Sequence, residues 1–147
     1  MGYSIGEVAK ATGMPASTLR YYDKEGLLPS LERKGGRRIF DEESIRALHV
    51  IECLKKSGLE IREIRQFMAL TTQGSETYAV RKELMEEQRC KTLEQIEELQ
   101  RTLALLEYKC WYYNEALRRG DEDFAQDAPT NLPEEAKELY RKAFPQD

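Results

Sequence analysis

The sequence predicts a mainly α-helical protein, in which a winged helix-turn-helix domain is followed by a long dimerising coiled-coil helix. Two short helical segments meet at a Gly-Met-Pro turn at residues 13–15. A basic segment with a central Gly-Gly pair occupies residues 31–40, and residues 78–118 contain no Pro or Gly. The 147 residues suffice for one domain, or for a small domain with an accessory element.

The first two helices are marked by their end residues. Ser4 and Glu7 have the spacing of a capping box, so a helix is expected from Ser4 to about Ala11. Gly13 then provides a stop, because glycine readily adopts the left-handed conformation that ends helices. Pro15 opens a second helix that runs to Lys24, with Leu19 as its core residue.

The segment from Leu31 to Phe40 predicts a short β-hairpin, or wing. Its Gly-Gly pair lies between Arg33-Lys34 and Arg37-Arg38, and paired glycines between two short runs are typical of a tight hairpin turn.

Two more helices are expected after the hairpin. Asp41 caps a third helix, which Ser57-Gly58 ends, and a fourth helix runs from about Glu60 to Leu70. Residues 71–77 are polar and predict a hinge.

The long helix at 78–118 carries an apolar seam with alternating spacings of three and four. This a/d pattern lasts for three heptads, and a single helix cannot bury it alone. A partner helix is therefore expected, and a short amphipathic helix is expected at 133–144. The seam residues are Ile96, Leu99, Leu103, Leu106, Cys110, Tyr113 and Leu117.

Charge and composition narrow the class of protein. The net charge is −4, but residues 1–72 hold 12 Lys and Arg against 10 Asp and Glu, a net of +2. No apolar run is long enough to span a membrane and no signal peptide precedes the first helix, so a cytoplasmic location and no membrane partner are expected. Three widely spaced cysteines do not form a disulfide framework.

The second helix and the hairpin carry side chains that suit double-stranded DNA. Hydroxyls and phenols bind phosphates at low desolvation cost, and arginine binds phosphate or pairs with guanine. A basic hairpin beside a major-groove helix is placed to bind the backbone. The expected DNA-binding residues are Ser17, Thr18, Arg20, Tyr21 and Tyr22 in the helix, and Arg33, Lys34, Arg37 and Arg38 in the wing.

The motifs resemble one family over residues 3–70. Ser4-Ile-Gly-Glu-Val-Ala, Thr18-Leu-Arg-Tyr-Tyr-Asp, Glu25-Gly-Leu-Leu-Pro and Gly36-Arg-Arg-Ile-Phe are similar to the MerR family of transcription regulators. The resemblance implies a homodimer held by an antiparallel coiled coil. It also implies a dimer that bends and untwists promoter DNA so that RNA polymerase can engage it. The expected division is 1–72 for DNA binding, 78–118 for dimerisation and 119–147 as a short effector segment.

The signal to which the protein responds is less well marked. The loop from Gly120 to Asn131 has no Cys or His, which argues against sensing of soft metals, and the chain lacks a local set of thiolates for an iron–sulfur cluster. Only some 28 residues follow the long helix, too few for a large ligand domain. No metal or cofactor is expected, and a small molecule or an electrophile is the expected class of inducer.

Two sensing sites remain open. Cys53, followed by Lys55 and Lys56, resembles the lone cysteine of the aldehyde- and electrophile-responsive branch of the family, although a free cysteine is also an ordinary packing residue. The alternative is an aromatic-lined ligand pocket next to Cys110, where the end of the coiled coil meets the DNA-binding domain of the other subunit; the simpler interpretation of Cys110 is coiled-coil packing. The residues that could wall this pocket are Trp111, Tyr112, Tyr113, Phe124 and Tyr140.

Two other functional classes compete with a non-enzymatic regulator. A thiol redox enzyme would use Cys53, but the sequence offers no His or carboxylate spaced to assist it. A coiled-coil interaction module without DNA binding is the other alternative, and the retained arginines Arg20, Arg37 and Arg38 argue against it.

Overall fold

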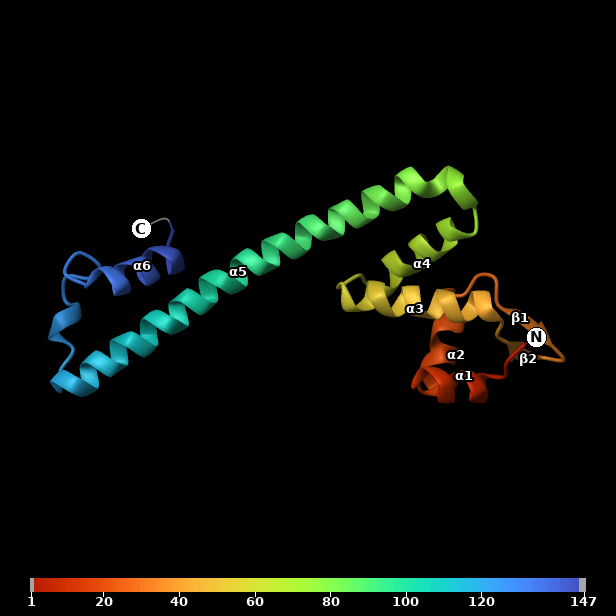
Figure 1. Ribbon diagram of the computed structural model, residues 1–147, viewed down its shortest axis with the longest axis horizontal. Coiled ribbons are helices and arrows are strands. Elements are labelled where there is room, and N and C mark those ends of the chain that lie inside the picture. Colours follow the sequence, from red (N-terminus) through yellow and green to blue (C-terminus); the bar gives the residue numbers. More distant parts are fainter. Residues whose placement is uncertain (1, 146–147) are drawn as a thin grey trace. The chain divides into compact units, whose positions relative to one another are not determined.

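The computed structural model describes residues 2–145 and confirms the mainly helical fold. The chain forms two compact units that divide between Cys90 and Lys91, within the longest helix (Figure 1). The elements are α1 (Ile5–Thr12), α2 (Ala16–Lys24), β1 (Glu32–Lys34), β2 (Arg37–Ile39), α3 (Glu42–Lys56), α4 (Ile61–Thr71), the 3-10 helix η1 (Gly74–Thr77), α5 (Tyr78–Arg119), the 3-10 helix η2 (Asp123–Ala125) and α6 (Glu134–Ala143).

The first unit has one apolar core, to which helices α1 to α4 and the end of the hairpin contribute. Phe40 follows β2 and is fully buried, and its backbone pairs with that of Tyr3 to tie the hairpin to the start of the chain. The core is formed by Val8, Leu19, Tyr22, Leu27, Leu28, Phe40, Leu48, Ile51, Leu54, Ile64 and Met68.

The helix ends follow the predicted capping chemistry. The Ser4 hydroxyl accepts from the Glu7 backbone N–H, and the Glu7 carboxylate accepts from the Ser4 backbone N–H at 2.7 Å, which completes a capping box. Gly13 ends α1 with φ of 74°. Asp41 caps α3, because its Oδ1 accepts from the Ser44 backbone N–H at 2.7 Å.

The expected hinge at 71–77 is more ordered than the sequence indicated. It contains η1, and Thr77 is buried. The Thr77 hydroxyl lies 2.9 Å from the carbonyl oxygens of both Leu70 and Gly74, so one side chain links the end of α4 to the start of α5. The sequence did not predict this link. A threonine whose hydroxyl binds nearby backbone carbonyls cannot be distinguished by sequence from a threonine in a polar loop.

The second unit is built on the later part of α5, against which α6 folds back (Figure 1). Tyr108, Leu132 and Ala136 form its buried core, and the rings of Trp111 and Tyr140 pack against them. The amphipathic helix expected at 133–144 is confirmed as α6.

The predicted seam of α5 is largely uncovered. Its apolar members are exposed, up to 84% for Leu117, whereas Ala104 and Tyr108, which face α6, are buried. At 3.6 residues per turn, the seam lies about half a turn round the helix from Ala104 and Tyr108. We call this surface the apolar stripe of α5, namely Ile96, Leu99, Leu103, Leu106, Tyr113 and Leu117.

None of the helices within residues 2–145 combines the length and the apolar character that crossing a bilayer requires.

The Asp41 cap predicts a specific pH dependence of stability. The backbone and hydroxyl hydrogen bonds from Ser44 hold the pKa of the Asp41 carboxyl below its usual range. The stabilisation is therefore fully present above pH ~4 and is lost as pH falls through the lowered folded-state pKa. We expect Asp41→Ala to lower the free energy of unfolding by about 1 kcal/mol at neutral pH, as measured by urea unfolding.

The control for this prediction is Asp41→Asn, which keeps an acceptor oxygen but cannot titrate. Its free energy of unfolding should stay near that of the parent protein at neutral pH and should not show the acid loss due to this cap. A cost for Asp41→Ala that is the same at pH ~7 and pH ~2 contradicts the assignment.

Candidate nucleic-acid interface

Helix α2 has one buried and one exposed face. Leu19 and Tyr22 lie three residues apart and are buried in the core of the first unit. This packing leaves Ser17, Arg20 and Tyr21 exposed, with Tyr21 at 46%. The exposed face thus carries a hydroxyl, a guanidinium and a phenol, which are groups that bind phosphates and base edges.

Tyr22 is the exception among the expected DNA-binding residues of α2. Its side chain is only 1% exposed, because its spacing of three from Leu19 places it on the core face of the helix. The Tyr22 ring therefore has almost no surface left with which to contact DNA, in contrast to the expectation from the sequence. Thr18 is half-buried and keeps an accessible edge.

The Tyr22 hydroxyl ties α2 to α3. It donates to Glu52 Oε1 at 2.6 Å and accepts from Lys55 Nζ at 3.3 Å. Burial, followed by the hydrogen bond and negative charge of Glu52, raises the pKa of Tyr22 well above its usual value. The phenol therefore stays protonated and keeps donating at any physiological pH.

The wing is the hairpin of β1 and β2. Gly35 and Gly36 form its turn with φ of 56° and 76°, a conformation that requires both central residues to accept positive φ. The register pairs Arg33 with Arg38 and Lys34 with Arg37.

A carboxylate that the sequence analysis did not single out joins the wing to α2. Asp23 Oδ2 accepts from Arg33 Nη2 at 2.7 Å and from Arg38 Nε at 2.6 Å. Lys34 and Arg37 are exposed and make no ion pair within residues 2–145. The four wing cations thus fall into two pairs with different surroundings.

The end of α2 is held from another side as well. Arg65 of α4 donates to the backbone carbonyl and to the carboxylate of Glu25, the latter at 2.9 Å. The sequence did not indicate the roles of Asp23 and Glu25, because their partners lie 10 to 40 residues away along the chain. Each is simply an acidic residue with basic residues near it in the sequence.

The residues expected to sense a signal lie in three settings. Cys53 is exposed in the last turn of α3, where its neighbour Leu54 takes the core position instead. Trp111 packs within the aromatic cluster of the second unit, with its ring 6.1 Å from that of Tyr108. Cys110 and Tyr113 are exposed on α5.

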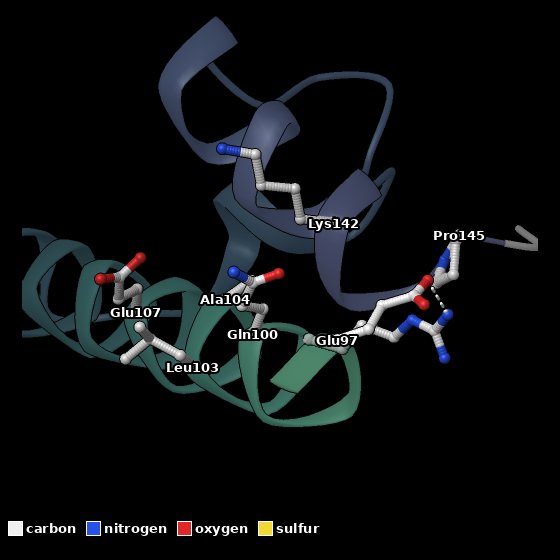
Figure 2. Close-up of a pocket in the computed structure, with 8 residues that line it drawn as sticks. Glu97, Gln100, Leu103, Ala104, Glu107, Lys142 and Pro145 are labelled. Carbon is white, nitrogen blue, oxygen red and sulfur yellow. Dashed lines mark hydrogen bonds and ion pairs between the residues drawn. The ribbon is translucent and has the colours of Figure 1, made fainter. Parts of the chain in front are cut away.

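An open groove runs along α5 beneath α6 in the second unit. Its volume is about 570 Å³, and it mixes the apolar Leu103, Ala104 and Pro145 with charged side chains. Figure 2 shows Lys142 on α6, on the other side of the groove from the labelled side chains of α5. Glu97 and Arg101, which both line the groove, form an ion pair of 2.7 Å. No aromatic ring of residues 2–145 lines this groove. A neighbouring open groove of about 530 Å³ brings two of the expected sensing residues together, because Cys110 and Trp111 both line it.

Among residues 2–145, no group of three or more His, Cys, Asp or Glu side chains is placed to hold a metal ion.

Comparison with models of protein families identifies the family of this chain. A model of the MerR HTH family regulatory protein matches residues 3–71, and a model described as MerR, DNA binding matches residues 45–108. The chain belongs to the MerR family. It is a DNA-binding transcription regulator, as the resemblance of its motifs predicted.

Two curated relatives of this MerR-family regulator support the assignment. An uncharacterized HTH-type transcriptional regulator of Haemophilus influenzae is 40% identical over 82% of this chain and 90% of its own length. The HTH-type transcriptional regulator AdhR of Bacillus subtilis is 38% identical over 62% of this chain and 66% of its own. Both relatives are named as regulators.

Solved structures of MerR regulators share the fold. HiNmlR, a MerR family regulator lacking the sensor domain and bound to promoter DNA, is 39% identical and covers 83% of this chain and 98% of its own, with a TM-score of 0.64. A putative MerR family regulator from Listeria monocytogenes is 30% identical over 80% of this chain and 90% of its own, with a TM-score of 0.67.

Arg20 provides the test of the exposed face of α2. We expect Arg20→Ala to weaken binding to a promoter duplex by about 1–3 kcal/mol, because a guanidinium that reads a base or binds a phosphate is lost. Fluorescence anisotropy with a labelled duplex measures the loss. Arg141→Ala removes an exposed arginine from α6 and serves as the matched control, and equal losses in the two variants contradict the interface.

Proposed function

We propose that this MerR-family regulator acts as a homodimer in which the α5 helices of two copies pair in antiparallel orientation. The observation that carries the proposal is the apolar stripe of α5, which stays exposed although α6 covers the other face of the helix. Six large apolar side chains in heptad spacing form an interaction surface, because pairing with a second helix removes them from water and lowers the free energy.

In the proposed dimer, two copies of α2 enter successive major grooves of a palindromic promoter. Ser17, Arg20 and Tyr21 face the DNA, with Thr18 at the edge, and the wing lies against the backbone. HiNmlR was crystallised on promoter DNA, and its likeness to this chain in sequence and fold supports the same role here.

The proposed mechanism is a distortion of the promoter without release of the protein. Bending or untwisting a binding site costs several kcal/mol, on the order of 1–6 for smooth bends, so a small change in the angle between two bound DNA-binding units alters the energy of the promoter. RNA polymerase then engages the realigned promoter. This is regulation without a catalytic step.

The proposed sensing residue is Cys53, and the proposed inducer is an electrophile that alkylates or oxidises it. Its thiol is accessible at the end of α3, and the preceding residue Glu52 accepts the hydrogen bond from Tyr22 of α2. A covalent modification of Cys53 would therefore occur next to Glu52, the side chain that joins α3 to α2. Cys110, Trp111 and Tyr113 form the alternative sensing site.

Dimerisation through the stripe is tested by Leu106→Glu. A carboxylate in the paired stripe has to be desolvated, so we expect this variant to bind a palindromic duplex no more tightly than a single half-site. Gel shifts with the two duplexes measure the difference. Leu105→Glu makes the same substitution about 100° round the helix and should keep the advantage of the palindrome.

The result that contradicts this proposal is a Leu106→Glu variant with the full palindrome advantage. A loss in both variants also contradicts it, since the effect is then not confined to the stripe.

Thiol sensing is tested with the three exposed cysteines. Cys53→Ser should leave DNA affinity unchanged and abolish the response to an added aldehyde or quinone in a promoter-reporter assay. Cys90→Ser and Cys110→Ser are matched controls that should respond normally. A normal response from Cys53→Ser ends the Cys53 proposal, and loss of response in Cys110→Ser moves sensing to the site at Cys110, Trp111 and Tyr113.

A further inference from the structure

We propose that Asp23 is a positioning residue that clamps the wing to α2, and that the wing contacts phosphates through Lys34 and Arg37 while Arg33 and Arg38 remain engaged with Asp23. The inference rests on the proposed contact between wing and DNA backbone. The proposal assigns different roles to the four wing cations, all of which the sequence predicted to contact DNA. Arg33 and Arg38 hold the wing to α2, and Lys34 and Arg37 contact phosphates.

The hairpin register separates the two pairs. Arg33 lies opposite Arg38, and Lys34 lies opposite Arg37. Side chains directly opposite each other in an antiparallel ladder share a face, and the next pair along points to the other face. Arg33 and Arg38 thus share the face that meets Asp23, and Lys34 and Arg37 belong to the other face, beside the turn.

Burial agrees with this division. The side chain of Asp23 is 12% exposed and that of Arg38 is 24% exposed, so this pair is largely shielded from solvent. Arg33 is more open at 53%, but one of its terminal nitrogens is bound to the same carboxylate oxygen. Charge-assisted hydrogen bonds of 2.6 to 2.7 Å in a shielded setting resist exchange for a phosphate.

The clamp also stabilises the hairpin itself. Two cations directly opposite each other in a ladder repel, and the carboxylate between Arg33 and Arg38 turns this repulsion into attraction to a common partner. Because Asp23 belongs to α2, the same contact joins the wing to the helix that carries Arg20.

The first test counts phosphate contacts from the salt dependence of binding. The association constant K of the protein for a random-sequence duplex of about 30 base pairs is measured over a range of salt concentrations. Each neutralised phosphate contributes about 0.9 to the slope of log K against log salt. Single variants Lys34→Gln, Arg37→Gln, Arg33→Gln and Arg38→Gln are compared. We expect Lys34→Gln and Arg37→Gln each to reduce the slope by about 0.9 per DNA-binding unit. Arg33→Gln and Arg38→Gln should each reduce it by less than half of that amount.

The second test removes the clamp. Asp23→Asn releases both arginines, so its salt slope should become steeper than that of the parent protein. Glu32→Gln is the matched control, because it removes the same charge from the exposed surface of the wing and leaves the clamp intact. The slope of Asp23→Asn should exceed that of Glu32→Gln by about 1 or more.

The outcomes separate the clamp from the proposed function. Equal reductions from all four cation variants overturn the clamp and keep the wing on DNA. No reduction from any of them removes the wing from DNA, and the clamp proposal falls with it. Equal slopes for Asp23→Asn and Glu32→Gln also overturn the clamp. If Asp23→Asn does not fold, as judged by circular dichroism, the four single variants decide alone.

Discussion

The apolar stripe of α5 is the constraint on which the proposed function depends. α6 folds back onto α5 and buries Ala104 and Tyr108, yet it leaves the opposite face of the helix in water. The exposed side chains keep heptad spacing, which is the pattern that a second helix covers in a coiled coil. The first unit holds one copy of α2, and a palindromic promoter would offer two major-groove sites. The proposed pairing of α5 helices would therefore both bury the stripe and supply the second copy of α2.

Within the first unit, α2 is held at its C-terminal end by three different elements. Tyr22 donates to Glu52 of α3, Asp23 binds the wing arginines, and Glu25 accepts from Arg65 of α4. These contacts leave the face with Ser17, Arg20 and Tyr21 unoccupied. A rigidly supported helix loses little conformational entropy when it binds, so this support would favour the proposed contact of α2 with DNA. The support also couples α2 to α3, which carries Cys53.

Local patterns in the sequence predicted most of the fold, because the signals were short-range. The capping box of Ser4 and Glu7, the Asp41 cap and the Gly-Gly turn each lie within a few residues. Long-range contacts were not predictable in this way. The burial of Tyr22 depends on its contact with α3, and the ion pairs of Arg33 and Arg38 depend on a carboxylate in α2, so neither could be read from local sequence. The domain boundaries and the DNA contacts stay predictions.

The direct measurement of the central claim is the mass of the protein in solution. Sedimentation equilibrium of the full chain at micromolar concentration, without DNA, reports whether the stripe of α5 is paired. One chain has a mass of 17.1 kDa, and the account predicts a single species of twice that value, 34.2 kDa. A species of 17.1 kDa that persists as the concentration rises would show that the stripe has no partner helix, and it would contradict the account.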